Sequence, residues 1–264
     1  MLRSGPAAIL AVLSFQTIFG QGVPPAFEVA SVKPSTPVPG SAIGLFTYPG
    51  GRIVASNYTL RMLIHEAYDI EDYRILSGPR WVDEDRYNIE AKPSESSESS
   101  KWVPANFKTP PNPEMRQMLQ TLLADRFQLK VHTEAKKESV YALVVAKGGP
   151  KLKTPTTTKE PFVSFGRVGS VDKAAVLSTL NGQNATIAQL VERLATVVKR
   201  KVLDQTDLKG NFDFQLEYAA DLAQSDAGES VFQALQDQLG LKLETQPGST
   251  DVLVIDHAEK PSGN

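Results

Sequence analysis

Apolar residues recur along this chain at two spacings, that of a strand with one buried side and that of a helix with one buried face. Residues 26–32 alternate between apolar and polar, which predicts a strand that ends at Pro34. Apolar residues three and four positions apart then predict a helix that starts at a cap on Asn57 and ends near Tyr68. Residues 86–91 alternate again, so the chain mixes strands with helices from its beginning.

The same order of elements occurs twice. A helix that begins at Pro113 is followed by apolar stretches at 127–134 and 140–147, which we expect to form two strands joined by a turn. The second half echoes this pattern at 232–245 and 251–256. The steps before it also correspond, since segments 58–64 and 86–92 have counterparts at 185–191 and 211–217. Self-similarity of this kind indicates an internally duplicated unit.

We therefore predict an α+β fold of two related halves, each with helices packed on antiparallel strands and hairpins. The expected organisation is a signal peptide at 1–22, a first half at 23–150, a polar linker at 151–161 and a second half at 162–264.

The first 22 residues have the pattern of an export signal. Arg3 precedes an apolar run of about ten residues, which is the length of a signal-peptide core and is too short to span a bilayer. Cleavage after Gly20, cleavage after Gly22 and retention as an anchor are all compatible with the pattern. We expect an exported protein, periplasmic or extracellular, with no membrane span in the mature chain.

The amino-acid composition excludes several classes of site and gives no support for others. The chain has no cysteine, which excludes disulfides, thiolate metal sites, a thiol nucleophile and a lipid-acceptor thiol. Its 41% hydrophobic and 22% charged residues are those of an ordinary globular protein. A formal net charge of −2 gives no reason to expect nucleic acid or an anionic membrane as a partner. About 240 residues remain after the signal, enough to bury a large core.

Candidates for catalysis are few. The three histidines, His65, His132 and His257, share no metal-ligand spacing, although the acidic residues Asp69 and Asp72 follow His65 closely. His65 is therefore kept as a weak candidate, either as a binding residue or as a half-exposed structural histidine.

The remaining patterns assign no catalytic residue, metal or cofactor. No serine-hydrolase elbow occurs, and the glycine pairs lack the patterns of dinucleotide and phosphate loops. Acidic pairs such as Asp83 with Asp85 and Asp204 with Asp207 fit solvated turns, with a calcium site or the paired carboxylates of glycoside hydrolysis as the alternatives.

Trp81 is the strongest binding candidate. It lies between Arg80 and Arg86, so an aromatic ring flanked by two cations forms the rim of a site for a peptide or a sugar. The alternative is that Trp81 fills the core beneath the turn at 77–79.

Several stretches carry a resemblance to a known family. Segments 27–34, 123–132, 146–150 and 254–261, with Trp81 after a Gly-Pro turn, resemble a large paralogous family of exported proteins expanded in soil Acidobacteria, whose domain is of unknown function. The resemblance implies no catalytic residues. Similar domains also occur behind membrane metallopeptidases of the antibiotic-sensor type, which implies extracytoplasmic sensing or recognition.

A second resemblance concerns the repeat. Segments 184–190 with 208–214, and 230–235 with 239–243, resemble small modules at the amino-terminal ends of secretins and TonB-dependent receptors, which bind other envelope proteins. We expect a non-catalytic binding module whose partner is an envelope protein, a peptide or a glycan. The alternatives are a cofactor-free hydrolase of envelope polymers that uses carboxylates and His65, and a sensor domain whose signalling partner is encoded separately.

Overall fold

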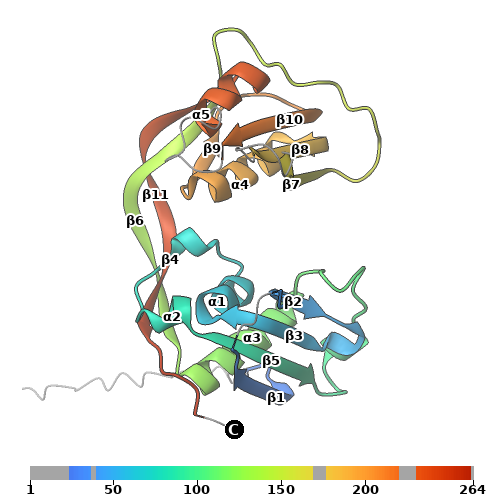
Figure 1. Ribbon diagram of the computed structural model, residues 1–264, viewed down its shortest axis with the longest axis vertical. Helices are drawn as coiled ribbons and strands as arrows, with labels where there is room; N and C mark the ends of the chain where they lie inside the picture. The colour runs from blue at the N-terminus through green and yellow to red at the C-terminus, as the bar shows by residue number, and fades with distance from the viewer. Residues whose placement is uncertain (1–23, 37–39, 169–176, 220–229, 263–264) are drawn as a thin grey trace, which may run out of the picture.

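The computed structural model describes residues 24–36, 40–168, 177–219 and 230–262, so the predicted signal segment lies outside the described residues. The fold is α+β, with helices packed on mainly antiparallel sheets, as the sequence predicts. Figure 1 shows two lobes on one side of a long two-stranded ribbon that connects them.

The first lobe is built on a four-stranded antiparallel sheet in the order β1-β5-β3-β2. Its strands are β1 (Phe27–Pro34), β2 (Gly44–Thr47), β3 (Ile53–Thr59) and β5 (Arg86–Pro93). Its helices are α1 (Leu60–Tyr68), α2 (Trp81–Glu84) and α3 (Pro113–Phe127), with 3-10 turns η1 (Pro49–Gly51), η2 (Asp72–Arg74) and η3 (Glu98–Lys101). The apolar faces of α1 and α3 cover the sheet, because the periodic residues that predict both helices are the buried ones.

The second lobe is also built on an antiparallel sheet, here of three described strands. Its antiparallel sheet has the order β10-β8-β7 and consists of β7 (Phe162–Val168), β8 (Leu177–Thr186) and β10 (Asn211–Ala219). The helices are α4 (Ile187–Val198) and α5 (Val231–Ala234), and α5 continues into the π-helical turn η5 (Leu235–Leu239).

The ribbon consists of β6 (Lys130–Val145) and β11 (Leu241–His257), which pair antiparallel along their length. Each strand leaves the last helix of one lobe and ends in the other. There β11 pairs in parallel with β4 (Ile75–Leu76), and β6 pairs in parallel with β9 (Val202–Asp204). The two lobes therefore exchange their last strands.

The expected turn between two short strands is wrong in both halves. Residues 134–140 and 245–251 continue straight through as parts of β6 and β11, and Pro247 and Gly248 lie opposite Ser139 and Glu138. These polar residues suit a turn, but here both faces of the ribbon's middle are exposed, so strand residues are polar too. The start predicted for the first of these strands is also wrong, because Phe127 is the last residue of α3.

Each lobe has its own apolar cluster. The first includes Leu253 and Ile255 from β11, and the second includes Leu143 from β6, so each cluster is closed by a strand from the other half of the sequence. The predicted division at 151–161 stays a prediction. Within that segment Lys153 forms an isolated bridge to Asp213 of β10, at the place that β1 occupies beside β5.

The first helix begins two residues later than expected. The cap is Thr59, whose hydroxyl accepts a hydrogen bond from the Met62 amide, and Asn57 is still part of β3. The second lobe uses the same device, since Thr186 caps α4 in a reciprocal capping box with Gln189. Asn57 suits a cap by residue type, but the strand runs on to Thr59, whose hydroxyl takes that role.

Asn57 and its counterpart Asn184 have a different role. Both have left-handed backbones, with φ of 54° and 48°. The amide of Asn57 donates to Asn88 Oδ1 at 3.0 Å, and the amide of Asn184 donates to Asp213 Oδ1 at 2.8 Å. Each bond ties the irregular end of a strand to its neighbour, just before the helix begins.

Candidate functional site

A hollow of about 360 Å³ opens where three distant parts of the first lobe meet. These parts are the end of β1, the junction between α2 and β5, and the tail that follows β11. We call it the Arg86 hollow, and its lining residues are Pro34, Ser35, Glu84, Asp85, Arg86, Tyr87, Lys260 and Pro261.

Arg86 is held in this hollow by the sheet. It is the first residue of β5, opposite Thr59, and its Nη1 donates to the backbone oxygen of Asn57 at 2.6 Å. Its own backbone oxygen accepts from the Ser35 amide at 2.7 Å. The side chain is half-buried, and no carboxylate in the described part of the chain forms an ion pair with it. Four of the five guanidinium donors therefore have no protein partner among the described residues.

Trp81 adjoins the hollow without lining it. Its ring is half-buried against the first apolar cluster, which is the role of a core residue. Lys260 Nζ lies 5.9 Å from the centre of the ring and 2.6 Å from Asp85 Oδ2. Lys260 therefore lies between the Trp81 ring and the Asp85 carboxylate at one wall of the hollow.

The other two candidates stand apart from the hollow. Arg80 is bound to Glu84 at 3.0 Å, its side chain is 91% exposed, and it is not a lining residue. His65 lies on α1, where its Nδ1 is 2.8 Å from the backbone oxygen of Ile70 and 4.0 Å from Asp72 Oδ1. Of the four candidates, Arg86 alone lines the hollow, Trp81 is linked to it through Lys260, and His65 does not line it.

The half-buried carboxyl of Glu66, which adjoins His65, was not singled out from the sequence. Burial raises the pKa of Glu66, and the hydroxyl of Tyr58 donates to its Oε1 at 3.2 Å. Burial and the nearby Glu66 carboxyl also raise the pKa of Tyr58. Groups of this kind serve as general acids or bases when they face a cleft. Glu66 and His65 line neither the Arg86 hollow nor the hollow described next.

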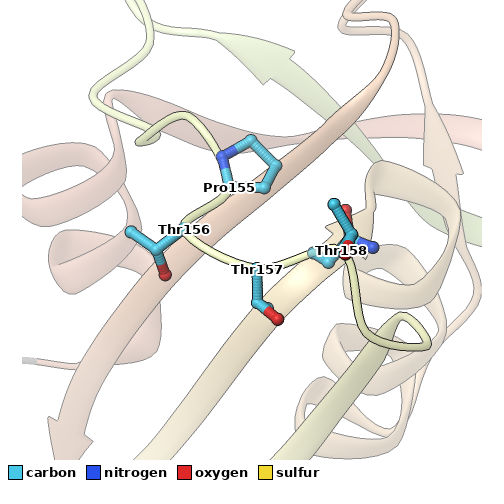
Figure 2. Close-up of a pocket in the computed structure, with 5 residues that line it drawn as sticks. Pro155, Thr156, Thr157 and Thr158 are labelled. Atoms are coloured by element: carbon cyan, nitrogen blue, oxygen red, sulfur yellow. The ribbon is translucent and has the colours of Figure 1, made fainter.

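A second, more open hollow of about 570 Å³ lies in the second lobe and is lined by Asn184 and residues 155–158. Figure 2 shows the run from Pro155 to Thr158 as an irregular stretch of chain that passes over strands of this lobe. We call it the threonine hollow. Asn211 of β10 lies opposite Thr186, as Arg86 of β5 lies opposite Thr59.

The threonine hollow is organised by Asp213. Its Oδ2 accepts from the amide and the hydroxyl of Thr156 at 2.8 Å and 2.7 Å, and its Oδ1 accepts from the Asn184 amide. These hydrogen bonds, led by that of Asn184, lower the pKa of the Asp213 carboxyl. No cation lines this hollow among the described residues, so its chemistry differs from that of the Arg86 hollow.

The acidic pairs have structural partners. Asp83 forms an ion pair with Arg61, and Asp204 accepts from the amide and hydroxyl of Thr206 at 2.9 Å and 2.8 Å. Within the described ranges, no three side chains of His, Asp or Glu are grouped to hold a metal ion. No described helix is long and apolar enough to cross a membrane.

Sequence reasoning found Arg86 because it is near Trp81 in the chain. It missed Lys260 and Ser35, which reach the hollow through long-range pairing of β1 with β5 and of β11 with β6. The repeated Asn-x-Thr segments at 57–59 and 184–186 were the available signal for equivalent places in the two halves.

A family model described as "Protein of unknown function (DUF3738)" matches residues 61–258. Neither a curated protein nor a solved structure matches the chain.

Proposed function

Because the chain belongs to the DUF3738 family of proteins of unknown function, a description that assigns no activity, we propose its function from the site. The protein is an exported, non-catalytic binding module of the cell envelope or the extracellular space. Its partner is an envelope protein, a peptide or a glycan, and its binding site is the Arg86 hollow with Trp81 beside it.

The observation that carries this proposal is the Arg86 guanidinium. A half-buried cation with free donors at the edge of a hollow is suited to bind a ligand, and its neighbours hold it in place. Export is supported by the signal pattern of residues 1–22 and by the absence of cysteine from the sequence. An acidobacterial paralogous family, and fusion of similar domains to membrane metallopeptidases, would agree with diversified recognition on a constant scaffold.

We also infer that the two halves descend from one duplicated unit. The supporting observations are the Asn-x-Thr segments before α1 and α4, the matching register of Arg86 with Thr59 and of Asn211 with Thr186, and the exchange of β6 and β11 between the lobes. On this view the two lobes offer two sites with different chemistry.

The competing function is a hydrolase of envelope polymers, for which the half-buried Glu66 carboxyl beside His65 is the candidate acid or base. The two functions differ in what happens to a bound polymer. A binding module retains it intact, whereas a hydrolase shortens it.

The test is retention of envelope extract and purified cell-wall polymers on the immobilised chain from Gln21 onward. Trp81→Ala is compared with Trp102→Ala, since both tryptophans are half-buried against the same cluster and only Trp81 adjoins the hollow. We expect loss of retention in Trp81→Ala alone. Equal retention by both variants would remove Trp81 from the site, and polymer breakdown would favour the hydrolase.

A further inference from the structure

We propose that the Arg86 hollow binds the free carboxylate of a peptide and that the Arg86 guanidinium is the receptor for it. This inference rests on the proposed binding function and names the chemistry of its ligand.

The first argument is the state of the guanidinium. Arg86 uses one donor on the backbone oxygen of Asn57, and this bond anchors one nitrogen of the group. A planar guanidinium with two adjacent free donors matches a carboxylate, which accepts two parallel hydrogen bonds. A half-buried cation without a counter-ion has lost part of its hydration. An incoming anion therefore supplies the negative charge and the hydrogen-bond acceptors that the protein does not.

The second argument is the balance of charge in the lining. Lys260 is paired with Asp85 at 2.6 Å, and Glu84 is paired with Arg80 at 3.0 Å. These pairs leave Arg86 as the lining charge that no opposite charge in the described part of the chain neutralises. Glu84 and Asp85 equal the two lining cations in number, so what attracts a negative group is the unpaired Arg86 guanidinium and not the net charge of the lining.

The third argument favours a peptide over an acidic sugar. Sugar sites commonly present an exposed aromatic face on which a ring stacks. Tyr87 is 3% exposed, and Trp81 packs on the core with Lys260 over its ring. The apolar part of the lining comes instead from Pro34 and Pro261, which offer no aromatic face on which a sugar ring stacks. A volume of about 360 Å³ lies within the range of small-ligand sites.

The second lobe supplies a natural comparison. Asn211 holds the place of Arg86 in β10, and its Nδ2 donates to Asn184 Oδ1 at 2.9 Å. A neutral residue is therefore compatible with the local backbone. Arg86→Asn copies this arrangement and removes the charge, which makes it a better test than a truncation to alanine.

The experiment titrates the chain from Gln21 onward with a mixture of N-acetylated tripeptides of random sequence that carry free carboxylates. The same mixture with amidated carboxyl ends is the control ligand, and binding is followed by NMR at the Arg86 Nε–H and nearby amides. We expect the carboxylate mixture to bind at least about tenfold more tightly than the amide mixture, a difference of about 1.4 kcal/mol.

The variants distinguish recognition by the Arg86 guanidinium from attraction by positive charge alone. Arg86→Asn loses the preference for the carboxylate, and Arg86→Lys, which keeps the charge without the fork, loses most of it. Arg52→Gln is the matched control, because Arg52 pairs with Glu90, which lies on β5 like Arg86, and Arg52 does not line the hollow. If circular dichroism shows that Arg86→Asn does not fold, the comparison of Arg86→Lys with Arg52→Gln decides whether the preference for the carboxylate depends on the Arg86 guanidinium.

Three results would overturn the inference. Equal binding of the carboxylate and amide mixtures would show that the free carboxylate is not what the hollow recognises. Tighter binding of a tri-uronate than of the peptides would show that the ligand is an acidic sugar and not a peptide. No binding of either mixture, with envelope material still retained by the chain, leaves the proposed function standing and rejects this ligand. Failure of retention as well would reject the proposed function itself.

Discussion

At the scale of single residues, Gly240 shows how much one position can decide. It follows η5 and begins the turn into β11 with a left-handed backbone of φ +65°. A Cβ atom at this position would lie 2.0 Å from the backbone oxygen of Gly149. The contact is backbone to backbone, so no side chain can move aside to relieve it.

Gly240→Ala is therefore expected to be strongly destabilising. The matched control is Gly210→Ala, because Gly210 also has a positive φ, of +92°, and nothing lies within 4 Å of its Cβ position. The left-handed backbone costs about 1–2 kcal/mol at each position. The clash at Gly240 adds about 1–3 kcal/mol more. Urea unfolding measures both, and equal losses would show that the backbone at Gly240 relaxes.

The residues of the site were predictable only where they lie near one another in the sequence. Arg86 and Trp81 are near one another in the sequence, so a single pattern suggested both. Lys260 reaches Trp81 only because β11 returns to the first lobe. Asn57 was predicted as a cap, and its residue type fits a cap and a left-handed strand position equally well.

At the scale of elements, Glu114 joins a helix to a loop. It lies in the first turn of α3, where its Oε2 accepts from the amide and hydroxyl of Ser99 at 2.7 Å and 2.6 Å. Its Oε1 accepts from the hydroxyl of Ser97 at 3.1 Å. These hydrogen bonds, led by the Ser99 hydroxyl, lower the pKa of the Glu114 carboxyl.

The stability of this junction should depend on pH. Because the folded pKa is below the unfolded one, the carboxylate stabilises the fold above the unfolded pKa, and this contribution disappears as the pH falls through the folded pKa. Glu114→Gln should lower the midpoint of thermal unfolding at pH 7 and should lose this effect in strong acid. Glu98→Gln is the control, since Glu98 forms an exposed ion pair with Lys101. An equal deficit of Glu114→Gln at both pH values would contradict the ionic origin.

The same scale shows which elements a sequence predicts well. Helices α1, α3 and α4 have periodic apolar residues that are buried in the structure, and their spacing is a local property. The ribbon was misassigned because the partner of residues 134–140 is about a hundred residues away along the chain. A polar, Pro-Gly-containing stretch predicts a turn unless its distant pairing partner is known.

At the scale of the whole molecule, neither lobe is complete without the other half of the sequence. Leu253 and Ile255 of β11 are 4% exposed within the first cluster, and Leu143 of β6 is fully buried in the second. The sheet order β4-β11-β6-β9 places the two exchanged strands at its centre (Figure 1). We therefore expect the exchanged strands, and not the predicted connection at 151–161, to hold the lobes together.

Cutting that connection should leave the protein assembled. A protease site inserted between Lys159 and Glu160, both exposed, separates the two halves of the chain. We expect the cleaved protein to elute as one species in gel filtration and to separate only in denaturant, because β6 and β11 stay paired and each closes the other lobe's core. The double substitution Leu253→Asp and Ile255→Asp should release the fragments, since it buries two unpaired charges in the first cluster. Separation of the cleaved wild-type halves under native conditions would mean that the exchanged strands contribute little to holding the lobes together, and that the covalent link does most of it.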